Sequence, residues 1–274
     1  ELAPMLDTPS NALLLCEAPG GFVQAVRDAW PKARWVAHSV AGDGRIPFKR
    51  LPGGGAVLAG APADGDMLSR AGFEFVRGIG ERTAATFDLI TADGSVDMEH
   101  DHVHEERLNV LLILREALVA VRCQSEGGSF VLKVFGLEGE ALTSLVWLLA
   151  HMYRRTRVVK PRTSRPTNSE LYVVFSGFLG AEHAPPGFER LHALDAPPGG
   201  AAVQRFCDMG GDARAQFAAI HAACAARQKA ALAAAFQVCN GRLPDATDSS
   251  VAFWEAVRPA SVRPASVGAA PAPQ

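Results

Sequence analysis

Apolar runs and amphipathic stretches alternate along residues 1–180 of the chain. Short apolar runs bounded by turn residues predict buried parallel strands, whereas apolar residues spaced three or four positions apart predict helices. The predicted strands cover residues 11–16, 33–40, 86–93, 129–135, 156–161 and 170–178, and the predicted helices cover residues 22–30, 105–123 and 139–153.

This alternation predicts an α/β fold with a mostly parallel sheet and helices on both faces. The last two strands are joined by a loop without a helix, which predicts one antiparallel strand at an edge of the sheet. Two segments are less regular. Residues 42–66 are rich in glycine and proline and predict a long irregular excursion, and we expect a short helix at 67–72 and a strand at 73–76.

The rest of the chain differs from this pattern. We expect residues 1–180 to form the α/β domain. Residues 181–257 combine a proline- and glycine-rich linker with an alanine-rich helical segment at 212–238 that packs on the domain. Residues 258–274 repeat the motif RPASV and predict a disordered tail. The predicted packing face of the helix consists of Phe217, Ile220, Cys224, Ala231 and Phe236.

Composition narrows the class of protein. The net charge is −2, so any contact with nucleic acid requires a local basic patch. Five scattered cysteines without CxxC spacing predict reduced thiols in a reducing intracellular compartment, the nucleus or the cytoplasm. The apolar runs are short and broken by charge, so we expect no membrane span and no signal peptide. The sequence begins at Glu1, which is typical of a processed chain or of a piece of a longer one.

A turn with two glycines follows the first predicted strand. Residues 17–22 read Glu-Ala-Pro-Gly-Gly-Phe and lead into the first helix. Glycine lets a backbone approach a ligand closely, and the helix offers its amino end to an anionic group. The carboxyl ends of parallel strands are also where such sheets bind ligands. The turn therefore indicates a nucleotide-like ligand, although plain strand-to-helix punctuation fits the motif equally well.

Three charged residues occupy the ligand side of the predicted sheet. Asp93 ends a strand, Lys133 lies within an apolar strand, and Glu170 opens the last strand. Taken singly, Asp93 fits a turn or helix cap, Lys133 an edge-strand side chain that reaches solvent, and Glu170 a surface acid. Together, an acid–lysine–acid cluster orients an ammonium group, and its lysine can accept a proton from a hydroxyl. Nearby acids also suit a cationic sulfonium.

Four fragments of the chain occur in one order: LLLCEAPGGF (13–22), DLITADGS (88–95), GGSFVLKVFG (127–136) and KPRTSRPTNSELYVV (160–174). Together they resemble the FtsJ-type, RrmJ-like ribose 2'-O-methyltransferases, and most closely the Adrift-like eukaryotic and viral enzymes of the mRNA cap. The resemblance covers about residues 11–178. It implies a Rossmann-like methyltransferase fold, S-adenosyl-L-methionine as cofactor, and methyl transfer to ribose 2'-hydroxyls of RNA at the cap-proximal nucleotides of mRNA.

The resemblance also implies roles for individual residues. Asp93, Lys133 and Glu170 match the last three members of the family's Lys-Asp-Lys-Glu tetrad, with Lys133 as the proton acceptor for the ribose hydroxyl. The residues implied to bind the cofactor are Glu17, Ala18, Pro19, Gly20, Gly21, Phe22, Asp66 and Asp93. The residues implied to contact the RNA are Lys160, Arg162, Ser164, Arg165, Asn168 and Ser169.

The chain departs from the family pattern at the first tetrad lysine, which should lie well upstream of the glycine turn. Residues 1–16 contain no lysine or arginine. Either a segment before Glu1 carries that lysine, or the site is incomplete and the chain is a catalytically impaired structural, assembly or RNA-binding protein. A methyltransferase that acts on ribosomal RNA is a further alternative, which the SRPTNSE motif at 164–170 disfavours.

Two further features each allow two interpretations. Residues 99–104 (EHDHVH) resemble a metal cluster, but they are crowded into one loop and no partner follows at a recognised spacing. We therefore expect a solvated or substrate-contacting loop there and no metal site. The basic run at 154–157, together with Lys160, Arg162 and Arg165, fits a solvated face, but its place before the SRPTNSE motif favours phosphate binding.

Overall fold

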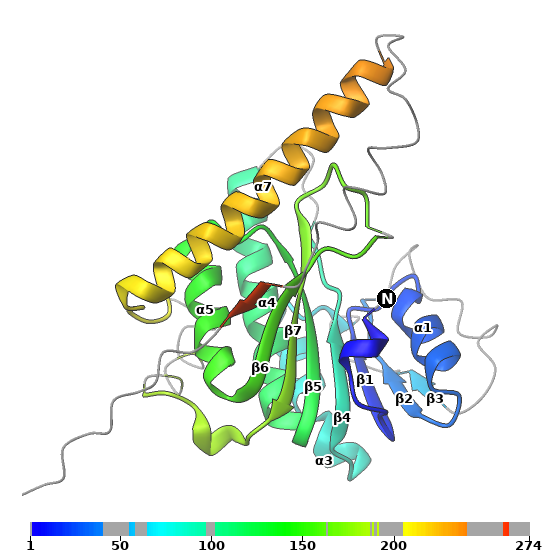
Figure 1. Cartoon of the computed structure of the whole chain (residues 1–274). Helices are drawn as coiled ribbons and strands as arrows, with labels where there is room; N and C mark the ends of the chain where they lie inside the picture. Colours follow the sequence, from blue (N-terminus) through cyan, green and yellow to red (C-terminus); the bar gives the residue numbers. More distant parts are fainter. Residues whose placement is uncertain are drawn as a thin grey trace, which may run out of the picture.

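The described residues of the chain form one mixed sheet of eight strands in the computed structural model (Figure 1). Their spatial order is β3-β2-β1-β4-β5-β7-β6-β8. The structure describes residues 2–40, 55–57, 65–96, 102–162, 164–186, 188, 191, 205–239 and 260–262. The strands are β1 (Asn11–Leu15), β2 (Arg34–Ala37), β3 (Gly55–Val57), β4 (Phe87–Ala92), β5 (Gln124–Phe135), β6 (Tyr153–Val159), β7 (Glu170–Phe178) and β8 (Ala260–Val262).

The five strands from β3 to β5 pair in parallel, whereas β7 runs antiparallel to both β5 and β6. The predicted α/β fold is therefore confirmed, but the antiparallel strand lies inside the sheet and not at its edge. The connection from β5 to β6 through α5 (Glu140–His151) leaves room for one strand between them. After β6 the chain reverses in the loop at 160–169, and β7 fills this gap with Glu170 opposite Phe135.

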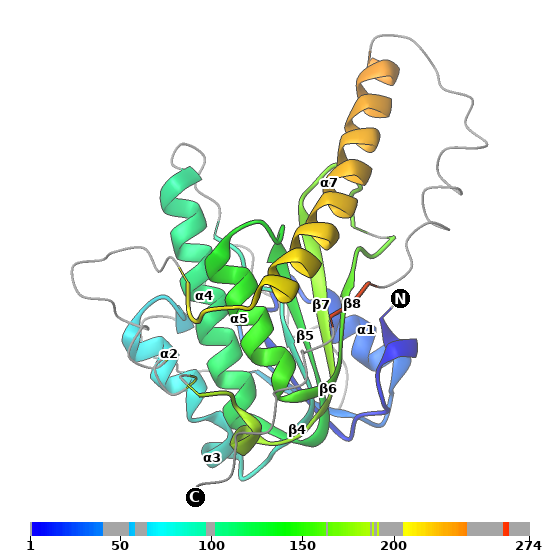
Figure 2. The same ribbon diagram turned by 60° about the vertical axis from the view of Figure 1, so that its left-hand side comes forward.

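Helices cover the two faces of the sheet unequally (Figures 1 and 2). One face carries α1 and the 3-10 turn Ala3–Met5, and the other carries α2 to α5. Neighbouring strand residues enter different cores, as Leu13 and Leu14 of β1 do, because successive side chains point to opposite faces. No helix among the described residues is both long enough and apolar enough to cross a bilayer. The other helices are α1 (Gly21–Ala29), α2 (Arg70–Arg77), α3 (Ile79–Thr83), α4 (His102–Cys123) and α7 (Gly211–Cys239).

The strand β3 was not expected from the sequence. Gly55–Val57 pairs in parallel with β2 inside the segment that we predicted to be an irregular excursion at 42–66. The apolar run at 56–59 (AVLA) is short and stands between glycines and prolines, and this composition favoured the prediction of irregular structure. Residues 41–54 and 58–64 lie outside the described part of the chain, and the prediction of irregular structure stays a prediction there.

The strand predicted at 73–76 is wrong, because these residues belong to α2. Ser69 caps this helix: its hydroxyl accepts a hydrogen bond from the backbone N–H of Gly72 at 2.9 Å. The residues that follow place apolar side chains on one buried helix face, at helical spacing. These side chains are Phe73 and Val76, and Ile79 at the start of α3 is buried in the same cluster.

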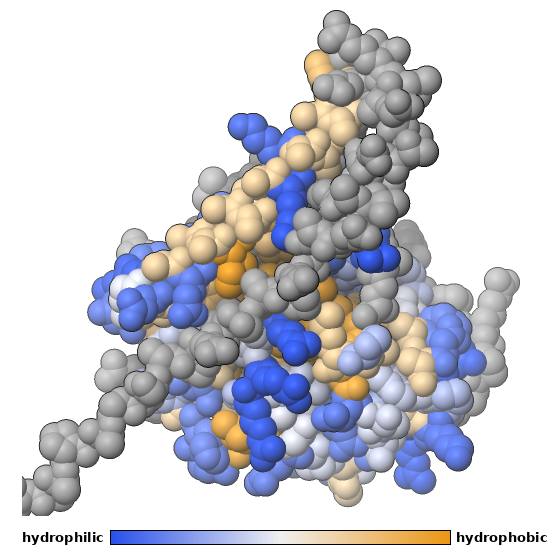
Figure 3. Space-filling view, in the orientation of Figure 1, coloured by the Kyte–Doolittle hydropathy of each residue, from blue (hydrophilic) through white to orange (hydrophobic). Residues whose placement is uncertain are grey.

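The first half of the helix α7 packs into the core of the domain. Phe217 and Ile220 are buried in the larger core, as are Phe206 and Met209 from the preceding segment. Phe236, in contrast, is 70% exposed, so the prediction that it packs on the domain is wrong. A helix of 29 residues is about 43 Å long. Its far half extends past the sheet in Figure 1 and forms a pale, apolar ridge in Figure 3.

Part of the predicted tail is ordered. Ala260–Val262 form β8, which pairs antiparallel with the outer edge of β6. Disorder was predicted for 258–274 and is therefore wrong for these three residues. The edge of β6 presents backbone donors and acceptors, so a short segment can add to it irrespective of its composition. The other residues of the tail lie outside the described part of the chain.

Candidate active site

The turn after β1 presents an open backbone edge at the carboxyl ends of the parallel strands. Gly20 has φ 112°, in the left-handed region that favours glycine, and it directly precedes α1. A side chain at Gly21 would meet nothing within 4 Å, so this position faces open space. The backbone N–H of Glu17 donates to the carbonyl of His38 at 2.9 Å, which ties the turn to the end of β2. The predicted ligand turn is therefore both fixed and accessible.

Glu17 points inward from this turn. Its side chain is buried, and Oε1 accepts hydrogen bonds from the backbone N–H groups of Phe22 at 2.6 Å and Val23 at 3.1 Å. The carboxylate thereby caps the amino end of α1. Burial raises the pKa of Glu17 to about 8, and these two amides oppose the rise. Among the described residues Oε2 has no hydrogen-bond partner, which leaves one acceptor beside the turn.

Lys133 and Asp93 form an ion pair at the end of β4. The Lys133 ammonium donates to the carbonyl oxygen of Asp93 at 2.6 Å and lies 3.1 Å from Oδ1 of the same residue. Lys133 is only 7% exposed, so this pairing offsets the cost of burying its charge. Burial raises the pKa of Asp93, and the Lys133 ammonium opposes that rise. The predicted acid and lysine are thus in direct contact, next to the glycine turn.

Tyr172, which the sequence analysis did not single out, joins this pair to Glu170. It lies opposite Lys133 in the register of β5 and β7, and its hydroxyl donates to Oδ1 of Asp93 at 3.1 Å. Burial raises the pKa of Tyr172, and the neighbouring carboxylates of Asp93 and Glu170 raise it further. Its ring centroid lies 5.8 Å from that of Phe22 in the turn. The available signal was its place two residues after Glu170, on the same strand face.

A buried acid that the sequence analysis also missed, Glu116 of α4, lies behind the end of β4. Its Oε1 accepts a hydrogen bond from the backbone N–H of Gly94 at 3.0 Å, and Oε2 has no partner among the described residues. Burial raises the pKa of Glu116 to about 8. The available signal was a carboxylate within the apolar face of the helix predicted at 105–123. The site therefore rests on a layer of acidic groups that the solvent does not reach.

Asp66 lies in the turn that starts α2. Its Oδ1 accepts a hydrogen bond from the backbone N–H of Leu68 at 2.8 Å, and its carbonyl accepts one from the Ser69 hydroxyl at 2.8 Å. The Nε2 atom of His38 lies 2.7 Å from the carbonyl oxygen of Gly65. Burial lowers the pKa of His38. These contacts hold the Asp66 turn at the end of β2, which itself bonds to the glycine turn.

Three residues predicted to contact RNA, Lys160, Ser164 and Asn168, form hydrogen bonds within the loop between β6 and β7. The Lys160 ammonium donates to Ser164 Oγ at 2.9 Å, to the Glu170 carbonyl at 2.8 Å, and to both the carbonyl and the side chain of Asn168. Ser164 in turn donates to the Glu170 carboxylate at 2.7 Å. These side chains therefore shape the loop that precedes Glu170. The other three, Arg162, Arg165 and Ser169, are exposed on the loop.

The site can be reached from the face of the sheet that carries α1. A cavity of about 680 Å³ opens there beside Asp93 and Tyr172. Its walls include Phe22 and Trp30 from α1 and its surroundings and Val131 from β5. The side chains of the EHDHVH segment at 99–104 lie outside the described part of the chain, so the expectation of a solvated or substrate-contacting loop without a metal site stays a prediction.

Comparisons with known proteins match the part of the chain that carries this site. The sequence model of the FtsJ-like methyltransferase family matches residues 4–178, which carry the glycine turn, Asp93, Lys133 and Glu170. The chain belongs to this family. The family predicted from four fragments of the sequence is therefore confirmed, and the chain is related to S-adenosylmethionine-dependent methyltransferases of RNA.

Members of the family with longer chains share part of their sequence with this one. The Danio rerio cap-specific mRNA (nucleoside-2'-O-)-methyltransferase 2 is 32% identical over 202 residues, which cover 66% of this chain and 26% of the relative. The "Probable methyltransferase EP424R" of African swine fever virus (strain Badajoz 1971 Vero-adapted) is 28% identical over 187 residues, 60% of this chain and 44% of the viral protein. The chain thus spans less than half the length of either relative.

Among solved structures, an rRNA methylase from Streptococcus thermophilus is similar in fold. It shares 12% identity with this chain at a TM-score of 0.42, over 65% of this chain and 92% of that one.

Proposed function

We propose that this chain transfers a methyl group from S-adenosylmethionine to a ribose 2'-hydroxyl of RNA, at the cap-proximal nucleotides of mRNA. The observation that carries the proposal is the contact of Lys133 with Asp93, joined through Tyr172 to Glu170, beside an open glycine turn. A relative named for cap-specific 2'-O-methylation supports the choice of RNA. Because mRNA is found in the nucleus and the cytoplasm, we propose one of these two compartments as the location of the protein.

The residues around the turn fit S-adenosylmethionine. The open position at Gly21 admits a close approach to the backbone, and Glu17 keeps one buried carboxylate oxygen without a partner among the described residues. Asp66 and Asp93 add negative charge, which favours a cationic sulfonium. We expect residues 17–22, Asp66 and Asp93 to hold the cofactor. When bound there, it supplies an electrophilic methyl group.

Lys133 is the residue that we expect to take the proton from the ribose hydroxyl. The ammonium that results is held by the carbonyl and the carboxylate of Asp93, the two groups that Lys133 contacts in the structure. Tyr172 fixes the Asp93 carboxylate from the other side. Because Lys133 is buried, these charges act in a medium with little water, where alignment and fixed electrostatics contribute most to rate.

Replacing Lys133 tests the proposed role directly. We expect Lys133→Ala to lower methyl transfer by at least about 100-fold, because the proton acceptor is lost, while cofactor binding persists. Transfer is measured as tritium incorporated from labelled S-adenosylmethionine into capped RNA, and binding is measured by calorimetry. The matched control is Lys32→Ala, which changes an exposed lysine and should leave both unchanged. Full activity in Lys133→Ala would remove Lys133 from this role.

The same assay separates the proposed substrate from the alternatives. Capped RNA, the identical uncapped RNA and a ribosomal RNA fragment are compared at equal concentration. Preference for capped RNA supports the proposal, whereas preference for the ribosomal fragment favours a ribosomal RNA methyltransferase. Binding of cofactor and RNA without transfer to any of the three would favour a structural or RNA-binding protein that has lost catalysis.

A further inference from the structure

The helix α7 reaches the site from outside the part of the chain that matches the family. It begins at Gly211, whereas the family match ends at residue 178. Phe217 and Ile220 anchor its first half in the larger core. The guanidinium of Arg214 adds a hydrogen bond to the carboxylate of Glu140 at 2.9 Å. The helix therefore has a fixed position when it passes the catalytic loops.

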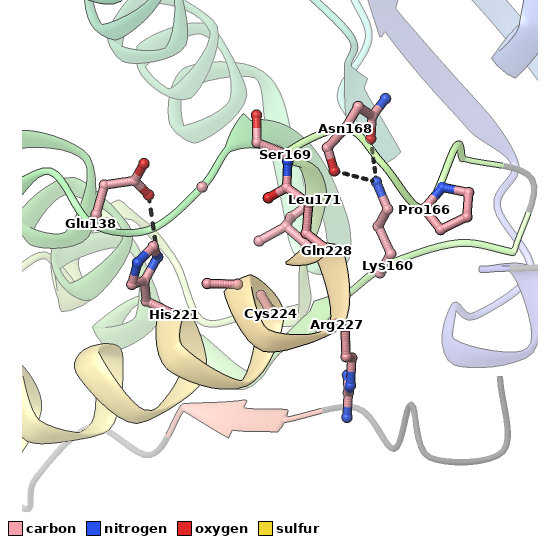
Figure 4. Close-up of a pocket in the computed structure, with 12 residues that line it drawn as sticks. Glu138, Lys160, Pro166, Asn168, Ser169, Leu171, His221, Cys224, Arg227 and Gln228 are labelled. Atoms are coloured by element: carbon pink, nitrogen blue, oxygen red, sulfur yellow. Dashed lines mark hydrogen bonds and ion pairs between the residues drawn. The ribbon is translucent and has the colours of Figure 1, made fainter. Parts of the chain in front are cut away.

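The helix α7 contacts two loops near the site. The first is the loop after β5, the strand that carries Lys133. The Nδ1 atom of His221 lies 3.3 Å from Oε2 of Glu138 in this loop, as Figure 4 shows. The loop is in turn bonded to the one before β7, because the backbone N–H of Gly136 donates to the carbonyl of Ser169 at 3.0 Å. The ends of β5 and β7 are thus held together where α7 passes.

The second contact is with the loop between β6 and β7. The Nε2 atom of Gln228 donates a hydrogen bond to the carbonyl of Thr167 at 3.0 Å. Gln228 is half-buried, and in Figure 4 it lies with Cys224 on the side of α7 that faces this loop. This bond connects two positions 61 residues apart in the sequence. It fixes one point in the middle of a loop that has no regular secondary structure.

From Thr167 a chain of hydrogen bonds leads to the catalytic glutamate. The next residue, Asn168, accepts hydrogen bonds from the Lys160 ammonium through its carbonyl and its side chain. Lys160 also donates to the carbonyl of Glu170, and Ser164 donates to the Glu170 carboxylate. A displacement of Thr167 would therefore move groups that orient Glu170 from two sides.

We propose that Gln228 is a positioning residue for methyl transfer: its bond to Thr167 holds the 160–169 loop in the conformation that sets Glu170 beside Tyr172. This inference rests on the proposed function. Gln228 does not touch the reacting atoms, so its loss lowers the turnover rate and leaves the cofactor site intact. The helix α7 is then a brace that this chain adds to the site of its family.

Two variants of the chain of residues 1–274 test this role: one removes the hydrogen-bond donor with little change of shape, and the other restores a donor. Gln228→Glu removes the N–H donor, and we expect kcat on capped RNA to fall about five- to tenfold, the effect of one lost neutral hydrogen bond. The KM and Kd for S-adenosylmethionine should stay within about twofold of the unchanged protein. Gln228→Lys restores a donor of similar reach and should recover most of the lost kcat.

The matched control is Gln216→Glu, which introduces the same charge at an exposed position of the same helix. It should leave kcat unchanged. Equal kcat values for Gln228→Glu and Gln216→Glu would overturn the proposal. So would an equally low kcat in Gln228→Lys, because rescue requires that the donor matters.

Hydrogen exchange distinguishes this proposal from the proposed function. In Gln228→Glu, the amides of residues 160–170 should exchange several-fold faster than in Gln216→Glu, whether or not RNA is methylated. Unchanged exchange in this loop would overturn the positioning role. An unmodified chain that methylates no RNA would instead reject the proposed function, and the exchange result would still decide whether Gln228 holds the loop.

Discussion

The hydroxyl group of Tyr172 connects the acidic residues of the site. It donates to Asp93, the partner of the Lys133 ammonium, and lies beside the carboxylate of Glu170. The Tyr172 ring is held independently of this hydroxyl by its contact with Phe22 and by the pairing of β7 with both neighbours. Removing the oxygen should therefore change the orientation of Asp93 without changing the fold.

We expect Tyr172→Phe to lower kcat about tenfold, the effect of losing one hydrogen bond to a charged group. The measurement is tritium transfer to capped RNA, with a thermal melt on the same samples. The other tyrosine of the chain provides the control. Tyr153 donates to Gln124 in the interior, so Tyr153→Phe should lower stability by about 1 kcal/mol and leave kcat unchanged. If the two variants had equal kcat values, Tyr172 would have no part in the reaction.

Glu116 makes the stability of the fold depend on pH. Its pKa is about 8 in the folded chain and near the ordinary value of 4.5 when unfolded. Between these pH values the folded state binds more protons than the unfolded state, so the free energy of unfolding falls as the pH rises from about 4.5 to about 8. The stability that protonation of Glu116 contributes is thus complete at low pH and lost above its folded pKa.

We expect Glu116→Gln to flatten this pH dependence. Glutamine keeps an acceptor for the N–H of Gly94 but carries no charge, so the variant should exceed the unchanged protein in stability at about pH 9, by on the order of 1–3 kcal/mol. Urea unfolding at several pH values measures the difference. Glu126→Gln, at an exposed glutamate, is the control. Its free energy of unfolding should depend on pH in the same way as that of the unchanged protein. If the free energy of unfolding of Glu116→Gln had this same pH dependence, the account would be refuted.

The places of Asp93, Lys133 and Glu170 in one site were predictable because each lies within a short local motif. Tyr172 and Glu116 were not, since their roles arise from contacts between distant positions. The Tyr172 hydroxyl bonds to a residue 79 positions away, and Glu116 to one 22 positions away. No spacing rule for helices or strands relates such positions, so only the folded sheet brings them together.

At the scale of elements, apolar runs predicted the strands that are covered on both faces. The exception at residues 73–76 has a physical cause: alternation in the sequence FEFV imitates a strand, but Ser69 caps a helix there. A Cβ atom at Gly72 would lie 2.1 Å from the carbonyl oxygen of Asp66, so the first turn of α2 also requires glycine at that position. The place of β7 inside the sheet was not predictable, because pairing order depends on space left between other strands.

At the scale of the whole molecule, the boundary at residue 180 that we predicted from composition does not divide the hydrophobic core. Side chains after it, including Phe188, Leu191 and Phe206, belong to the same cluster as the helices and strands of the α/β domain. Phe217 and Ile220 of α7 join this cluster too. The family match therefore ends at residue 178 while the packing continues beyond it. Composition shows where a sequence changes character, but not where its contacts end.

We expect a chain that ends at residue 180 to be unstable. Each large apolar side chain removed from the core costs about 1.5–3 kcal/mol, and at least Phe188, Leu191, Phe206, Phe217 and Ile220 are lost. The sum, about 7.5–15 kcal/mol, is as large as the whole stability of a typical domain, about 5–15 kcal/mol, so the truncated chain should aggregate or lack a cooperative thermal transition. Circular dichroism and gel filtration measure both. A chain that ends at residue 257 keeps these residues and should remain folded; a stable, monomeric 1–180 chain would show that the appendage is dispensable.

The strand β8 has a consequence for how copies of this chain behave at high concentration. It occupies the outer edge of β6, where unsatisfied N–H and C=O groups would otherwise form a template for another molecule. By pairing with β6, the three residues of β8 thus protect this edge of the sheet from edge-to-edge association. Proteolytic removal of the last segment would therefore leave backbone N–H and C=O groups of β6 unpaired, and another copy of the chain could pair with them.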